Sequence, residues 1–66
     1  MNLREVIKDR RKVLGISQHD LAEMSGISLP TVKDIERGLA NPSLSTISKL
    51  LDVLGMEIVY RVRQKI

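Results

Sequence analysis

The chain has 66 residues, no cysteine and one histidine. A domain of this size buries only about 60% of the surface that its unfolded chain exposes, and without cysteine it has no disulfide or thiolate metal site, so we expect oligomerisation to add stability. The formal net charge is +3, and the sequence contains neither an apolar run long enough to span a membrane nor a secretory signal pattern, which predicts a cytoplasmic protein without membrane contact.

Charge is distributed unevenly along the chain. Basic residues outnumber acidic ones in residues 1–14 and again in residues 56–66, whereas acidic groups gather in the middle. This pattern is compatible with a polyanionic partner, although many ordinary domains share it. With one histidine and no cysteine, the chain offers neither a nucleophile–base set nor a metal-ligand cluster. We therefore expect no enzymatic activity, no metal and no cofactor.

Helical periodicity predicts a first helix over residues 2–14. Apolar residues recur on one face, and favourable capping residues stand at both ends. The apolar residues are Leu3, Val6, Ile7 and Leu14, and the caps are Asn2 and Gly15. Arg11 breaks the pattern because it lies on the apolar face, where a charge needs a partner or a route to solvent.

Two shorter helices follow, joined by a turn. Ser17, with a carboxylate three residues later, forms a capping-box pattern that predicts the start of the second helix. Gly26 can adopt the positive φ that a tight turn requires. Ser28 opens the third helix, where Pro30 is tolerated because its missing N–H has no intrahelical acceptor. Gly38 marks the end of this helix.

A fourth helix and a strand complete the predicted fold. The helix runs from its cap Ser43 to Gly55. The sequence then changes to a period of two, which predicts a β-strand. Its apolar positions are Met56, Ile58, Tyr60 and Val62. A lone strand would lack ladder partners, and the simplest partner is the same strand of a second copy, related by a two-fold axis. We therefore divide the chain into a helical domain, residues 1–55, and a dimerisation strand, residues 56–66.

The second and third helices, with their glycine-containing turn, match the helix-turn-helix pattern. Its residues are Ser17-Gln18-x-x-Leu21-Ala22, Gly26-Ile27-Ser28, Thr31-Val32-x-x-Ile35-Glu36-Arg37-Gly38 and Asn41-Pro42-Ser43. Over residues 3–55 the chain resembles the Cro/cI-type (XRE-family) helix-turn-helix domain. The resemblance implies a mainly α, lambda-repressor-like domain of four helices that binds double-stranded DNA. It also implies a structural ion pair between Arg11 in the first helix and Glu36 near the end of the third.

A recognition helix presents its first residues to base edges in the major groove, so we expect most DNA contacts in the third helix. The predicted DNA-binding residues are Gln18, Ser28, Leu29, Pro30, Thr31, Lys33, Asp34 and Arg37. Lys33 can donate to guanine or to a phosphate, whereas Leu29 and Pro30 can make only apolar contacts, such as with a thymine methyl. Asp34 can accept from cytosine, repel DNA or pair with a neighbouring cation.

Phosphate contacts are expected at the helix ends. Gln18 stands at the start of the second helix, where its amide can meet a phosphate. Thr31 and Arg37 stand near the two ends of the third helix and are predicted to contact phosphates as well. Few of the predicted side chains suit direct base readout, so we expect much of the affinity to come from phosphates and part of the selectivity from DNA shape.

The C-terminal strand further resembles that of HipB-type antitoxin repressors, in which the strands of two subunits pair. This implies a homodimeric repressor on a palindromic operator at its own promoter, with recognition helices about 34–36 Å apart. It also implies binding to a co-encoded kinase-like toxin. Two alternatives remain open: a phage-type or stand-alone repressor without a toxin, and a protein-interaction module that mainly neutralises a partner. The module is suggested by Leu29 and Pro30 on the recognition helix.

Overall fold

Four helices form the body of the protein. The computed structural model describes residues 2–64 and contains α1 (Leu3–Val13), α2 (Gln18–Ser25), α3 (Leu29–Arg37) and α4 (Leu44–Val53). The predicted mainly α architecture is confirmed, and the helices begin and end within two residues of the expected positions. Residues 1, 65 and 66, at the ends of the two predicted segments, lie outside the described residues.

Each helix begins at a side chain that caps it. Ser17 Oγ accepts a hydrogen bond from the Asp20 backbone N–H at 2.9 Å, and Asp20 Oδ2 accepts one from the Ser17 N–H at 3.0 Å. This reciprocal pair is the predicted capping box. The other caps are Asn2, Ser28 and Ser43. Gly26 and Gly38 end α2 and α3 with φ of 74° and 76°, a left-handed conformation that favours glycine.

The core lies where the four helices meet. α3 packs against α1 and α2, and α2 also packs against α4. The buried apolar residues are Ile7, Leu21, Ala22, Val32, Ile35, Leu50, Leu51 and Leu54. Every helix or its C-cap therefore contributes to one small cluster. Because α3 packs against the core with one side only, its opposite side is available for contacts with other molecules.

Two arginines of α1 bind the C-terminal ends of other helices. Arg10 Nε donates to the carbonyl of Leu54 at 2.9 Å, and Arg4 Nη1 donates to the carbonyl of Arg37 at 3.5 Å. The last carbonyls of a helix have no intrahelical donor, so a cationic donor is favourable there. These bonds tie α1 to the ends of α4 and α3.

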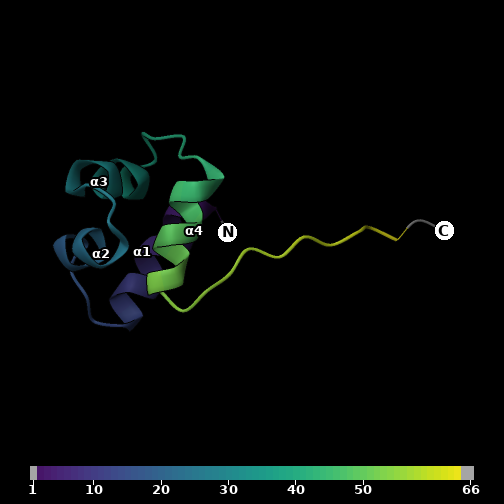
Figure 1. Cartoon of the computed structure of the whole chain (residues 1–66), viewed down its shortest axis with the longest axis horizontal. Coiled ribbons are helices and arrows are strands. Elements are labelled where there is room, and N and C mark those ends of the chain that lie inside the picture. The colour runs from purple at the N-terminus through teal and green to yellow at the C-terminus, as the bar shows by residue number, and fades with distance from the viewer. Residues whose placement is uncertain (1, 65–66) are drawn as a thin grey trace.

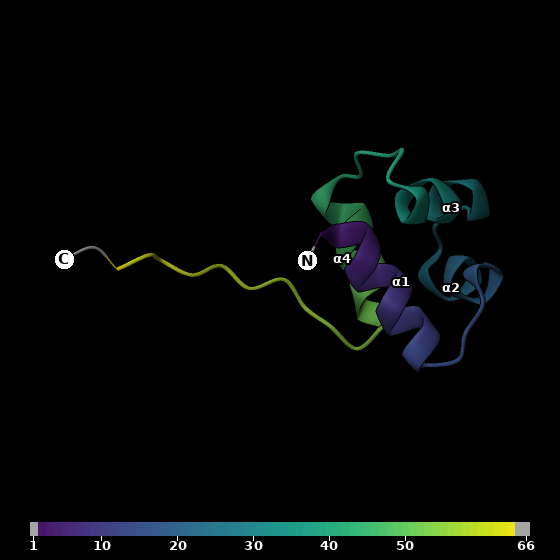
Figure 2. The same cartoon turned by 180° about the vertical axis from the view of Figure 1, so that it is seen from behind.

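Residues 56–64 do not form the predicted strand in the single chain. A strand needs a ladder of backbone hydrogen bonds, and no segment within residues 2–64 supplies one to this tail. Figures 1 and 2 show the tail leaving the end of α4 and extending away from the helices. Tyr60 and Val62 are 79% and 90% exposed, whereas Ile58 packs against the core. Only the root of the tail is therefore held by the domain.

No helix among the described residues is long and apolar enough to cross a membrane. Residues 2–64 also bring together no group of three or more histidine, aspartate or glutamate side chains that could hold a metal ion.

Candidate nucleic-acid interface

α3 has one buried side and one outward-facing side. Val32, Ile35 and Glu36 are buried. Since successive residues are about 100° apart around a helix, the opposite side is formed by residues 30, 33, 34 and 37. This outward side of α3 consists of Pro30, Lys33, Asp34 and Arg37. All are exposed except Asp34, which is half-buried. Four of the eight predicted DNA contacts thus share one surface.

The first turn of α3 holds three more of the predicted contacts, in different roles. Ser28 Oγ caps the N–H of Thr31, and the two hydroxyls are hydrogen-bonded at 2.8 Å. These groups therefore organise the start of the helix. Leu29 is half-buried and packs against the core, so its side chain supports the domain and is not freely presented. The spacing of Leu29, three residues before Val32, is consistent with this packing, but the sequence interpretation assigned Leu29 to the DNA surface because it stands at the start of the recognition helix.

Asp34 and Arg37 form an ion pair along the outward side of α3. Of the roles considered for Asp34, the local pairing with a cation is the one that the structure contains. The carboxylate of Asp34 therefore neutralises part of the positive charge of Arg37. No carboxylate of the described residues forms an ion pair with Lys33. Lys33 is therefore the cation of this surface that is most free to meet DNA.

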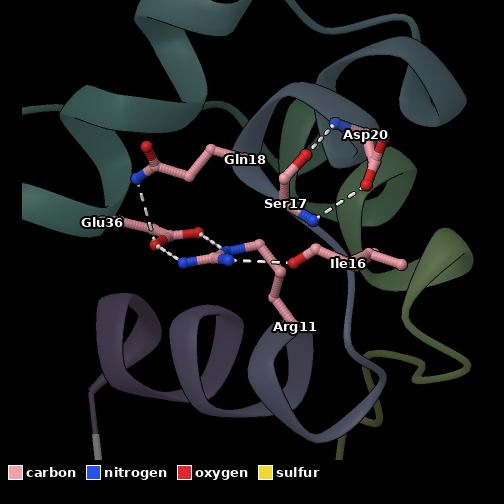
Figure 3. Close-up of polar contacts among 6 residues, drawn as sticks. All are labelled: Arg11, Ile16, Ser17, Gln18, Asp20 and Glu36. Carbon is pink, nitrogen blue, oxygen red and sulfur yellow. Dashed lines mark hydrogen bonds and ion pairs between the residues drawn. The ribbon is translucent and has the colours of Figure 1, made fainter.

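A buried ion pair fixes the position of α3 on α1 (Figure 3). Arg11 Nε and Nη2 donate to the two carboxylate oxygens of Glu36 at 2.8 and 2.9 Å, and Arg11 Nη1 donates to the Ile16 carbonyl at 2.9 Å. The side chains are 12% and 3% exposed. The hydrogen bond with Glu36 raises the pKa of Arg11 above its ordinary value. The pairing that the family resemblance implied is thus present in the structure.

Gln18 takes part in the same network. Its Nε2 donates to Glu36 Oε1 at 3.2 Å, which links the first turn of α2 to the inner edge of α3 (Figure 3). Sequence reasoning missed this contact, because the partner lies 18 residues away. It also missed Arg4 and Arg10, which donate to the last carbonyls of α3 and α4. Backbone acceptors of this kind cannot be recognised from the order of side chains in a sequence. A phosphate contact by Gln18 stays a prediction.

The four residues predicted for dimerisation lie at and beyond the root of the tail. Ile58 is half-buried and Met56 is 37% exposed, whereas Tyr60 and Val62 project freely. A groove of about 340 Å³ separates the tail root from α4. Its lining consists of Leu44, Ser48, Leu51, Asp52, Met56, Glu57, Ile58 and Tyr60. The groove thus combines apolar side chains with two carboxylates.

Comparison with known proteins identifies the family. The family model described as "Helix-turn-helix" (HTH_3) matches residues 7–61. An "HTH-type transcriptional regulator" of Haemophilus influenzae is 45% identical over 53 residues, which is 80% of this chain and 53% of the relative. The regulator DdrOP3 of Deinococcus deserti is 36% identical over 58 residues, or 88% of this chain and 45% of the relative. An "HTH-type transcriptional regulator" of Methanothermobacter thermautotrophicus is 36% identical over 55 residues, or 83% and 80% of the two chains.

The chain spans about half the length of the first two of these relatives. None of the three names describes an antitoxin. The match to the family model begins within α1, includes the whole of α2, α3 and α4, and extends into the tail. The chain therefore belongs to the Cro/cI-type (XRE-family) group of helix-turn-helix transcriptional regulators.

Proposed function

We propose that this protein is a sequence-specific transcriptional repressor that binds DNA as a homodimer and inserts the outward side of α3 into the major groove. The observation that carries the proposal is the geometry of α3. Its inner side is anchored by apolar residues and by the Arg11–Glu36 pair, while Pro30, Lys33 and Arg37 are exposed on the other side. A rigid helix with a cationic outer face suits the major groove.

The side chains of α3 suggest how the contacts divide. Lys33 has no acidic partner among the described residues and can donate to guanine or to a phosphate. Pro30 can contact a thymine methyl. Arg37 reaches a phosphate only by giving up part of its interaction with Asp34. Such a surface makes few bidentate base contacts, so phosphates and DNA shape supply much of the binding.

The homodimer is proposed from the tail and the groove beside α4. Tyr60 and Val62 are large apolar side chains left almost fully exposed, which is unfavourable for an isolated chain. Pairing the tails of two copies as antiparallel strands would satisfy their backbone groups and bring apolar residues over the groove. Charge is complementary, since Arg61 in the tail is basic and Asp52 and Glu57 line the groove.

A role in autoregulation with a toxin is the most specific form of the proposal. It rests on the resemblance of the tail to that of HipB-type repressors, and it makes the protein the antitoxin of a HipBA-like pair with a kinase-like toxin. A stand-alone repressor would use the same DNA surface without the toxin. The interaction-module alternative loses support, because Leu29, one of the two apolar residues that suggested it, packs against the core.

DNA binding is tested by fluorescence anisotropy with DNA from just upstream of the gene and with a scrambled duplex, at several salt concentrations. We expect a clear preference for the upstream DNA and a steep salt dependence. Lys33→Ala should weaken specific binding by about 1–3 kcal/mol if Lys33 contacts a base. Lys49→Ala, which removes an exposed lysine from α4, is the matched control. Equal, weak binding to both duplexes would contradict a sequence-specific repressor.

The dimer is tested by deleting residues 56–66 and measuring the mass in solution by light scattering. The last fully buried core residue is Leu54, and of the residues packed against the core the deletion removes Ile58, so the truncated chain should keep its helices, which circular dichroism checks. We expect the full chain to be dimeric and the truncated chain monomeric. A truncated chain that remains dimeric would exclude the tail as the dimerisation element.

A further inference from the structure

α1 carries a row of cations that none of the contacts proposed above uses. Arg4, Lys8 and Lys12 are spaced four residues apart, so they follow one side of the helix, and all three are exposed. From the first to the last, the row spans about 12 Å of helix axis at 1.5 Å per residue. No ion pair within the described residues involves any of the three. We call this set the α1 cation row.

The α1 cation row borders α3. Together with Glu36, its three residues line a polar groove of about 560 Å³. Glu5 and Asp9 complete the lining on the outer side. Glu36 adds no free charge, because both of its oxygens accept hydrogen bonds from Arg11. The groove therefore has three cations against two unpaired carboxylates.

The row is continuous with the surface proposed for DNA. Arg4 donates to the Arg37 carbonyl, so its guanidinium lies at the C-terminal end of α3. Glu36 brings α3 into the lining of the groove, and Lys33 stands three residues before Glu36 on the outward side of the same helix. The groove of the α1 cation row therefore ends at the helix that is proposed to meet DNA.

We propose that the α1 cation row binds backbone phosphates next to the bases that α3 contacts, and so extends the footprint of each protomer beyond one major groove. The inference rests on the proposed function, since it adds residues to the same DNA surface. A lysine ammonium acts as a point charge that suits a phosphate and carries no base preference. Each phosphate contact also releases counterions and so adds to the salt dependence of binding.

The geometry favours a nucleic-acid backbone over an acidic protein. A phosphate backbone is a narrow line of negative charge, which can follow the row while leaving Glu5 and Asp9 outside. A broad acidic surface would have to cover those two carboxylates as well, and like charges brought together are unfavourable. Glu5 and Asp9 each follow a cation of the row by one residue and so lie about 100° further around α1, away from α3, which leaves the row itself open to a phosphate backbone.

The test compares salt dependence among variants of the full chain. Lys8→Gln and Lys12→Gln, alone and together, remove charge from the row, and Lys49→Gln removes one exposed lysine from α4 as the matched control. Arg4 is left intact because it also caps α3. Anisotropy titrations with the upstream duplex give the slope of log affinity against log salt concentration. This slope should become shallower by about 0.9 for each lysine removed per bound protomer. The ratio of affinities for upstream and scrambled DNA should not change.

The outcomes separate this inference from the function on which it rests. If the double variant keeps the wild-type slope while Lys33→Ala weakens binding, the α1 cation row does not contact DNA and the repressor proposal stands. If the wild-type protein shows no salt-dependent DNA binding, both fail. If the Lys8→Gln, Lys12→Gln variant keeps the wild-type affinity and salt slope for DNA but no longer binds a protein that the wild type binds, the row is a protein-binding surface and the inference is wrong.

Discussion

The Arg11–Glu36 pair makes a prediction about stability that can be worked out from its geometry. Both side chains are nearly buried, at 12% and 3% exposed. Removing one partner leaves the other as an uncompensated buried charge, which lowers the unfolding free energy by about 3–5 kcal/mol. A chain of 66 residues is expected to have a total unfolding free energy of only about 3–10 kcal/mol. Either Arg11→Met or Glu36→Leu should therefore remove a large part of the stability.

The double variant shows whether an unpaired buried charge or lost side-chain packing destabilises the single variants. Replacing both partners by apolar residues of similar size is often neutral or stabilising, so Arg11→Met with Glu36→Leu should recover most of the loss. Urea unfolding followed by circular dichroism, at one fixed protein concentration, measures all four proteins. The buried, unpaired charge would not explain the loss if each single change costs less than about 1 kcal/mol of unfolding free energy, or if the double change costs the sum of the two.

Three further predictions concern other parts of the domain. Gly38→Ala should lower the unfolding free energy by about 1–2 kcal/mol, because alanine is strained at positive φ. Gly26→Ala should lower it less, because only the new Cβ at position 38 would meet another side chain, Arg4, at 3.1 Å. Equal urea midpoints for the two variants would contradict this. Hydrogen bonds from Ser17 lower the pKa of Asp20. Its ionised form therefore stabilises the fold above the unfolded-state pKa, and this contribution is lost as pH falls through the lower folded-state pKa. Wild type and Asp20→Asn should differ in urea midpoint at neutral pH and converge as pH falls through the folded-state pKa of Asp20, whereas a constant difference would exclude the capping carboxylate as its source. Asp34→Asn should raise affinity for specific and scrambled DNA alike, because it frees Arg37 and removes a negative charge; anisotropy showing weaker binding would instead make Asp34 a base contact.

The helices were predictable because their signals are local. The capping box at Ser17 and the glycines that end α2 and α3 are read from residues within a few positions of one another. Their structures follow the sequence to within two residues. Arg11 was also recognisable as a charge on an apolar face, and the family resemblance supplied its partner.

The contacts that the sequence did not reveal are long-range. Gln18 donates to Glu36 on α3, and Leu29 is half-buried against the core; neither contact was predicted, and the DNA contacts expected of both residues stay predictions. Arg10 binds a carbonyl 44 residues away. Residues 56–64 find no strand partner within residues 2–64, so their alternating pattern alone did not determine their conformation, and pairing with a second copy stays a prediction.

We propose the outward side of α3 as the surface that meets DNA. The most direct measurement is a titration of isotope-labelled protein with the upstream duplex, followed by amide chemical shifts in two-dimensional NMR. We expect the largest changes on α3 between Leu29 and Arg37 and on the first turn of α2, with little change around Lys49 on α4. Changes confined to α4 and the tail, or no changes at concentrations where the duplex binds, would contradict this proposal.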